Sequence, residues 1–137
     1  MTQENKELLL KDLCARLPYG VIIEYNNDGC SSTRELGLGS LHDFMFDNAE
    51  LKPYLRPMSS MTEEEKKEFH KLKQFSVTVV MPNGVSRIKP TYIVDLEDDG
   101  DGINYLYDWL NAHHFDYRGL IEKGLALEAP EGMYKNY

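Results

Sequence analysis

Cysteine is scarce in this sequence, and the scarcity excludes two ways of stabilising a small fold. Cys14 and Cys30 are the only cysteines among 137 residues. A disulfide scaffold of this length needs more of them, and a structural zinc site needs several Cys or His ligands at close spacing. Cys14 falls on the apolar stripe of a predicted helix and Cys30 in a polar loop, so we expect two free thiols in a cytoplasmic protein.

Long apolar runs are missing as well. No stretch approaches the ~18 apolar residues that are needed to span a membrane. The first residues carry neither the basic region nor the apolar run of a signal peptide. We therefore expect no membrane partner.

Positive charge is in short supply. Fifteen Lys and Arg residues stand against 23 Asp and Glu residues, which gives a net charge of −8. Sequence-independent binding to nucleic acid depends on Lys and Arg that neutralise phosphates, so a nucleic-acid partner is not expected. The carboxylates are densest between residues 95 and 101, and a weaker lysine excess covers residues 66–73. Such charge usually marks a solvated surface; the alternative is an acidic face that meets a basic partner.

The common signatures of catalysis are absent too. The sequence contains no G-x-S-x-G, H-E-x-x-H, Walker A or G-x-G-x-x-G pattern, so we assign no catalytic residue and lean away from an enzyme. The acidic segment imitates a calcium loop through Glu97, Asp99, Asp101, Gly102 and Asp108. The match is poor because such a loop should begin with Asp and end with Glu. The sequence predicts no metal and no cofactor.

What is present has the size and composition of one globular domain. Hydrophobic residues make up 42% of the chain and charged residues 28%, which is ordinary for a soluble domain of this length. No linker, repeat or low-complexity tract interrupts the chain. We therefore predict a single domain over residues 1–137.

Local patterns predict the elements of the first half. Leucines at helical spacing, a capping Thr2 and a terminating Pro18 predict the first helix. β-branched and aromatic residues, followed by turn residues, predict strands and a hairpin. The expected elements are a helix over 3–16, a strand over 19–25, a turn over 26–29, a strand over 35–41, another around Leu41, Phe44 and Phe46, and an extended piece or tight turn between Pro53 and Pro57.

The second half alternates helices with strands. Thr62 and Glu65 form a capping box at the start of a helix. Alternating apolar residues and a Pro-Asn-Gly turn predict a hairpin after it. The expected elements are a helix over 62–73, strands over 75–81, 85–89 and 91–96, a helix over 103–113, a helical turn over 119–123 and a last apolar strand over 125–127.

Together these elements predict an α+β fold with three main helices and short antiparallel strands. A helix followed by short, glycine-containing strands that close near Leu55 favours a small SH3-like or Sm-like barrel in the N-terminal half. That analogy concerns the fold class and implies no particular function.

Three stretches resemble a family of small proteins from gut bacteria and their prophages. The stretches are DLCARLPYG at 12–20, KPYLRPMSSMTEEEKKEF at 52–69 and WLNAHHFDYRGLIEKGLALEAPEGMY at 109–134. No activity is attached to that family, so the resemblance carries over no site residue. It implies a setting: an intracellular protein related to phages or mobile elements.

The densest group of chemically capable side chains follows the third predicted helix. Histidine is the natural acid or base near neutral pH, and clustered aromatic residues can anchor a partner. The adjacent His113 and His114 diverge by about 100° on a helix, so they cannot readily chelate one ion. The same residues also suit a structural corner at a helix end. The candidate binding residues are Tyr105, Trp109, His113, His114, Phe115, Asp116, Tyr117 and Arg118.

Three functional hypotheses follow. The leading one is a non-enzymatic binding or regulatory protein that contacts another protein through the third helix and the following corner. The second is a small-ligand binder or enzyme with a pocket near residues 109–118, in which His114, Asp116 or Arg118 has a perturbed pKa. The third is an acidic mimic of nucleic acid that occupies a basic protein.

Overall fold

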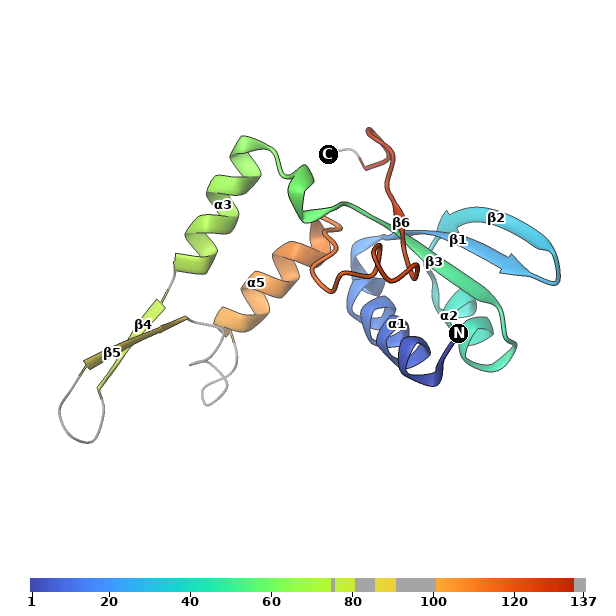
Figure 1. Ribbon diagram of the computed structural model, residues 1–137, viewed down its shortest axis with the longest axis horizontal. Coiled ribbons are helices and arrows are strands. Elements are labelled where there is room, and N and C mark those ends of the chain that lie inside the picture. Colours follow the sequence, from blue (N-terminus) through green and yellow to red (C-terminus); the bar gives the residue numbers. More distant parts are fainter. Residues whose placement is uncertain (75, 81–85, 91–100, 135–137) are drawn as a thin grey trace. The chain divides into compact units, whose positions relative to one another are not determined.

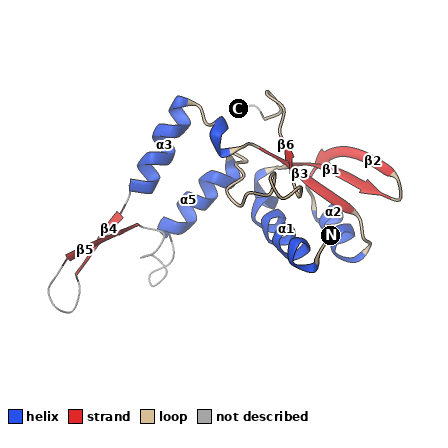
Figure 2. Ribbon diagram, viewed as in Figure 1, coloured by secondary structure: helices blue, strands red, loops and turns tan. Residues whose placement is uncertain are grey.

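A computed structural model describes residues 1–74, 76–80, 86–90 and 101–134, with side chains for 1–72 and 106–134. The fold is α+β, as the sequence predicts (Figures 1 and 2). No helix within these ranges is both long and apolar enough to cross a bilayer. The helices and strands are α1 (Gln3–Arg16), β1 (Ile22–Asn27), β2 (Cys30–Glu35), α2 (Leu38–Phe46), β3 (Glu50–Leu55), α3 (Glu63–Gln74), β4 (Ser76–Val80), β5 (Ser86–Pro90), α5 (Asp101–Ala112) and β6 (Leu127–Glu128), with 3₁₀ turns at Leu17–Tyr19 and Met58–Ser60.

The chain divides into two compact units. The first unit combines Met1–Ser59 with the segment that begins at Asn111, and the second unit is Ser60–Leu110. Each unit is described by itself below. The single domain expected from the sequence stays a prediction.

The first unit is built on an open four-stranded sheet in the order β2-β1-β3-β6. β1 pairs antiparallel with β2 and β3, and β6 runs parallel to β3. Asp28 and Gly29 turn the β1–β2 hairpin with φ angles of 53° and 83°. The turn predicted at 26–29 is therefore confirmed at its last two residues, while Asn26 and Asn27 belong to β1 and pair with β2. Within the described residues β2 and β6 remain at the sheet edges. The prediction of a small SH3-like or Sm-like barrel in the N-terminal half is therefore wrong.

The barrel fails because a predicted strand segment is a helix. Residues 35–41 and the Leu41, Phe44 and Phe46 positions were expected to be strands, but α2 runs from Leu38 to Phe46. Leu41 and Phe44 lie three residues apart and are both buried, which is the spacing of one helical face. Phe44 and Phe46 would lie on the same face of a strand, but only Phe44 is buried and Phe46 is exposed.

α1 forms where the sequence predicts it, but a different face is buried. Thr2 caps the helix through its Oγ1, which accepts the Asn5 amide N–H at 3.1 Å. Cys14, expected on the apolar stripe, is exposed. The charged Asp12 and Arg16 instead share the buried face with the apolar residues of the helix.

The core of the first unit lies between the sheet and the two helices α1 and α2, which cover the same face of the sheet (Figure 1). Apolar side chains from the turn before β6 complete it. The central members are Leu9 and Leu13 of α1, Ile23 and Tyr25 of β1, Leu41 and Phe44 of α2, Leu51 and Leu55 of β3, and Leu120 and Leu125.

The second unit contains α3, the β4–β5 hairpin and most of α5. The predicted capping box is confirmed: the Thr62 N–H donates to Glu65 Oε1 at 3.0 Å, and the Glu65 N–H donates to Thr62 Oγ1 at 3.1 Å. β4 pairs antiparallel with β5, and Pro90 ends that ladder opposite Ser76. The strand predicted over 91–96 and the acidic segment up to residue 100 lie outside the described residues.

Candidate functional site

The predicted site residues are divided between the two units. Tyr105 lies on α5, in the part whose side chains are not described. Trp109 is half-buried in the second unit, where its ring stacks on Phe69 with centroids 5.8 Å apart. Its Nε1–H donates to Glu68 Oε2 at 2.9 Å. Trp109 therefore joins α5 to α3, and among the side chains described on α5, Tyr107 is an exposed aromatic one.

Residues 113–118 form a corner in the first unit, and its centre is buried. Phe115 is fully buried, and His114 and Asp116 are each only 8% exposed. Phe115 forms a parallel bridge with Arg56: the Arg56 N–H donates to His114 O at 2.7 Å, and the Asp116 N–H donates to Arg56 O at 2.9 Å. The corner thus pairs with the residue that follows β3, in an isolated bridge, and it presents little of its centre to solvent.

Asp116 has a structural task in this corner. Its two carboxylate oxygens accept the backbone N–H groups of Leu120 and Ile121 at 2.8 and 3.0 Å. A carboxylate in this position caps a helical turn. The aspartate therefore stabilises the turn predicted at 119–123, and both of its carboxylate oxygens are used as acceptors for backbone N–H groups.

His114 lies in an apolar and cationic environment. Its ring stacks on Tyr134 with centroids 3.7 Å apart, and its Nδ1 is buried without a hydrogen-bond partner among the described residues. Burial, followed by the charges of Arg16, Arg56 and His113, lowers the pKa of His114 to about 4. The ring is therefore neutral at physiological pH.

Tyr134 anchors the other side of this stack. Its hydroxyl accepts the Ile22 N–H at 3.0 Å and donates to Tyr54 O at 2.7 Å, where the β1–β3 ladder opens. Burial raises the pKa of Tyr134 to about 12. The phenol therefore stays protonated and able to donate.

A buried ion-pair network fastens the corner to α1. Arg16 donates from Nε to Asp12 Oδ2 and from Nη2 to Phe115 O, both at 2.7 Å. Arg118 donates to the second oxygen of Asp12 at 3.1 Å. Asp12 and Arg16 are fully buried, whereas the Arg118 side chain is 21% exposed. The buried Asp12 carboxylate is therefore offset by two guanidinium groups, one of them buried.

Sequence reasoning missed Asp12 and Arg16. Charged residues on a helix are usually solvated, and the apolar stripe predicted for the first helix does not include these two. The available signal was their spacing, because Leu9, Asp12, Leu13 and Arg16 are separated by three, four and seven residues and hence share one face. An Asp–Arg pair on an apolar face indicates a buried pair that needs a further partner.

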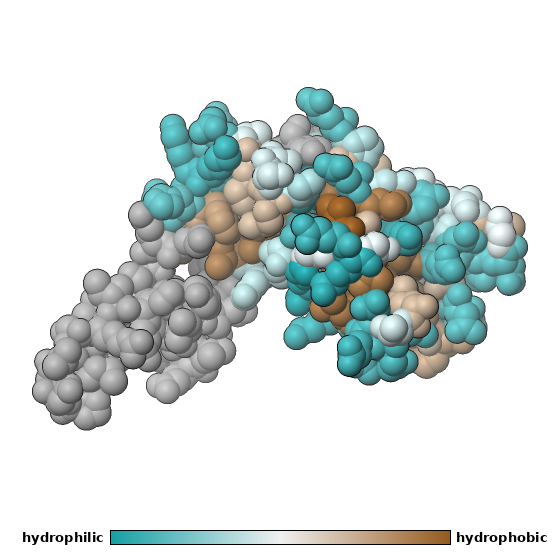
Figure 3. Space-filling view, in the orientation of Figure 1, coloured by the Kyte–Doolittle hydropathy of each residue, from teal (hydrophilic) through white to brown (hydrophobic). Residues whose placement is uncertain are grey.

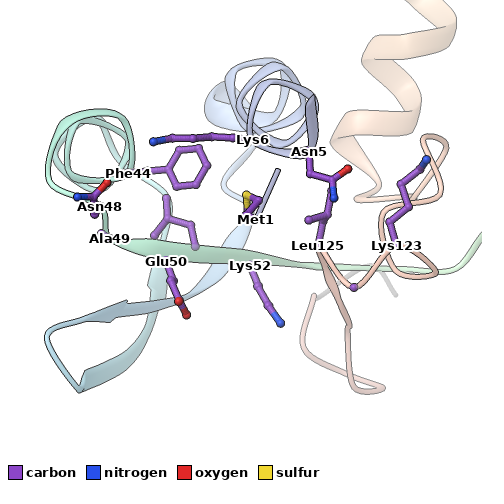
Figure 4. Close-up of a pocket in the computed structure, with 12 residues that line it drawn as sticks. Met1, Asn5, Lys6, Phe44, Asn48, Ala49, Glu50, Lys52, Lys123 and Leu125 are labelled. Atoms are coloured by element: carbon purple, nitrogen blue, oxygen red, sulfur yellow. The ribbon is translucent and has the colours of Figure 1, made fainter. Parts of the chain in front are cut away.

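The structure contains a pocket, and it lies away from the predicted corner. A cavity of about 540 Å³ in the first unit is bounded by the start of α1, the end of α2, the first half of β3 and the turn before β6 (Figure 4). We call it the first-unit pocket. His114, Asp116 and Arg118 are not among its lining residues.

A second surface feature is the outward side of α2. Leu38, Met45 and Phe46 are 73%, 40% and 67% exposed. With His42, whose ring contacts that of Phe46 at 4.9 Å, they are spaced as i, i+4, i+7 and i+8, which is one helical face. We call these four residues the α2 outer face. Hydrophobic side chains also reach the surface among hydrophilic ones over the region of α1 and α2 in Figure 3.

Three ligand-type side chains gather at the end of α2. His42, Asp43 and Asp47 each bring one atom within 4.8 Å of the others. Asp43 already accepts a hydrogen bond from the Tyr25 hydroxyl at 2.7 Å, and this bond raises the pKa of Tyr25. Exposed acidic groups commonly lie together without a metal, so we assign no metal centre here.

Comparison of the chain with family models, curated proteins and solved structures found no match. Function is therefore inferred from the geometry of the described residues.

Proposed function

We propose that this chain is a non-enzymatic binding protein that acts by contact with another protein, and that the contact is made by the α2 outer face. The observation that carries the proposal is the exposure of Leu38, Met45 and Phe46 on a helix of nine residues. Burying a large apolar side chain contributes roughly 1.5–3 kcal/mol. A partner that covers these side chains removes apolar surface from water.

The spacing of the α2 outer face supports docking into a groove. Amphipathic helices that lie in hydrophobic grooves are recognised by anchors at i, i+3 or i+4, and i+7. Leu38, His42 and Met45 have this spacing, and Phe46 widens the stripe. The inner side of α2 is held by Leu41 and Phe44 in the core, so the helix is a rigid support for the contact.

Charge indicates the chemistry of the partner. Asp43 and Asp47 border the α2 outer face, and α2 contains no Lys or Arg. The chain as a whole carries −8. We therefore propose an apolar groove with basic residues at its rim, since complementary charge steers and orients such contacts.

This proposal moves the expected contact from α5, the third predicted helix, and the following corner to α2. The centre of the corner is buried, so it offers a partner protein little surface. Tyr107 on α5, at 40% exposure, keeps the original hypothesis testable beside the new one.

We also propose a cytoplasmic setting related to phages or mobile elements. Cys14 and Cys30 are free and exposed, and exposed thiols persist in a reducing compartment. The sequence resemblance supports the phage-related setting.

Site-specific crosslinking tests the contact. Replacing His42 with a photoreactive phenylalanine derivative places the probe at the centre of the α2 outer face. We expect a crosslinked product with a protein other than this chain, identified by mass spectrometry, and we expect added salt to reduce its yield because the rim is charged. Adding Met45→Ser and Phe46→Ser should reduce the yield about tenfold or more.

Tyr107→Ser is the matched control, because it removes an exposed aromatic residue from the second unit. It should leave the yield unchanged. A yield that depends on Tyr107 and not on Phe46 would show that the contact is made by α5, as first predicted. A product with twice the mass of the chain would identify a second copy as the occupant and contradict the proposal of a basic partner.

A further inference from the structure

We propose that the first-unit pocket binds a linear dicarboxylate: an apolar chain with a carboxylate group at each end. The pocket brings together an apolar base and a lysine–asparagine pair at each end. This inference does not rest on the proposed function, because the lining residues do not include the α2 outer face.

The size and base of the pocket suit a small apolar body. Its volume of about 540 Å³ falls within the range of roughly 300–1,000 Å³ found for small-molecule sites. Phe44, Leu51 and Leu125 form the base, and all three belong to the core. The Met1 side chain lies between the two ends (Figure 4).

The polar groups lie at the two ends. Figure 4 shows Lys6 extending across Phe44 toward Asn48 at one end; at the other end Asn5 lies above Leu125 and Lys123 lies beside them. Lys6 Nζ is 5.7 Å from the centroid of the Phe44 ring, so its ammonium group lies at the edge of the apolar base. An ammonium and an amide together provide N–H donors that match a carboxylate.

The charge balance of the pocket differs from that of the chain. Three lysines and one glutamate line it, whereas the whole chain carries 15 basic and 23 acidic residues. Glu50 and Lys52 extend from β3 on the side away from Phe44 and Lys6 (Figure 4). Of the four charged side chains that line the pocket, Lys6 and Lys123 are the two that do not extend to that side, and both favour an anion.

Two separated cationic ends select for two anionic groups. A monocarboxylate would leave one ammonium group without a counter-charge, and an uncharged chain would leave both. The second carboxylate should therefore tighten binding by about tenfold or more.

Titration with three ligands of equal chain length tests the proposal. Sebacate, decanoate and decanediol carry two, one and no carboxylates, and binding to the full chain is followed by calorimetry and by amide chemical shifts. We expect sebacate to bind at least about tenfold more tightly than decanoate. The shifts should map to Asn5, Asn48 and Gly124. Equal binding of decanediol, or no binding of sebacate, would overturn the proposal.

Lysine variants locate the charges. Lys6→Gln and Lys123→Gln should each reduce the affinity for sebacate to about that for decanoate, and Lys6→Arg should restore it. Lys11→Gln is the matched control, because Lys11 is exposed on the same helix but does not line the pocket. If Lys11→Gln weakens binding as much as Lys6→Gln, the lysines act only through the overall electrostatic potential of the surface, and the proposal is wrong. Thermal unfolding of each variant confirms that it is folded.

Discussion

At the scale of single residues, His114 shows how this chain uses chemically capable side chains for structure. Its backbone has a φ of +63°, a conformation that residues other than glycine adopt uncommonly. The ring lies against Tyr134 and near Arg16 and Arg56. A charged imidazolium in that place would face two guanidinium groups without water, so the native state holds the neutral form.

This arrangement predicts a dependence of stability on pH. The pKa of His114 is about 4 in the folded chain against 6.5 for the free side chain, so the unfolded chain binds more protons between those values. The free energy of unfolding should therefore fall as pH drops from 6.5 to 4. We expect His114 to account for about 2 kcal/mol of this loss. Urea unfolding at several pH values measures it.

The variant His114→Asn separates the contribution of His114 from the other contributions to the loss of stability at low pH. Asparagine tolerates a positive φ and does not titrate, so the variant should show a shallower pH dependence although it loses the stack on Tyr134. His42→Asn removes an exposed histidine and should keep the slope of the parent chain. An unchanged slope in His114→Asn would contradict the assignment.

At the scale of elements, local signals decided some segments and packing decided others. The Thr2 cap and the Thr62–Glu65 capping box fixed the starts of α1 and α3 as predicted. α2 has no side-chain cap, because Gly37 precedes it. Its apolar positions fit either a strand or a helix, and burial of Leu41 and Phe44 against the sheet selected the helix.

The β1–β2 turn offers a test of conformational strain alone. Gly29 has a φ of +83°, and a Cβ added there would meet nothing within 4 Å. Gly29→Ala should therefore destabilise the chain by about 1–2 kcal/mol through backbone strain and not through a clash. Urea unfolding measures the change.

Gly39→Ala is the matched comparison. This glycine also has open space around its Cβ position, but it lies within α2 and its φ is not in the positive range that disfavours side chains. The variant should be more stable by about 0.5–1 kcal/mol, since alanine is the better helix former. Equal effects of the two substitutions would show that backbone conformation does not determine the result.

At the scale of the whole molecule, the chain leaves the first unit after Ser59 and returns at Asn111. The two passes are joined just inside the first unit, where Arg56 pairs with Phe115. The core residues of the first unit come from both sides of the excursion, as Leu55 and Leu120 do. Within the first unit, the segment before residue 60 and the segment after residue 110 therefore lie next to each other.

This organisation predicts that the first unit folds without the second. A chain in which residues 60–110 are replaced by a short Gly-Ser linker should retain dispersed amide signals for α1, α2 and the sheet in a two-dimensional NMR spectrum. It should also keep the Arg56–Phe115 pairing as protection from hydrogen exchange. A collapsed spectrum would instead support the single cooperative domain predicted from the sequence.

The sequence by itself determined the fold class, α1, the β1–β2 turn and the capped start of α3, because caps, turn residues and periodicity act within a few residues. Only the tertiary structure decided that residues 38–46 are helical, that Asp12 and Arg16 belong to the core, and that the aromatic-histidine corner is largely buried. Each of these depends on partners distant in the sequence, as Arg16 depends on Phe115. The first-unit pocket has the same origin, since Lys6 and Lys123 come to line one pocket only when the chain has folded.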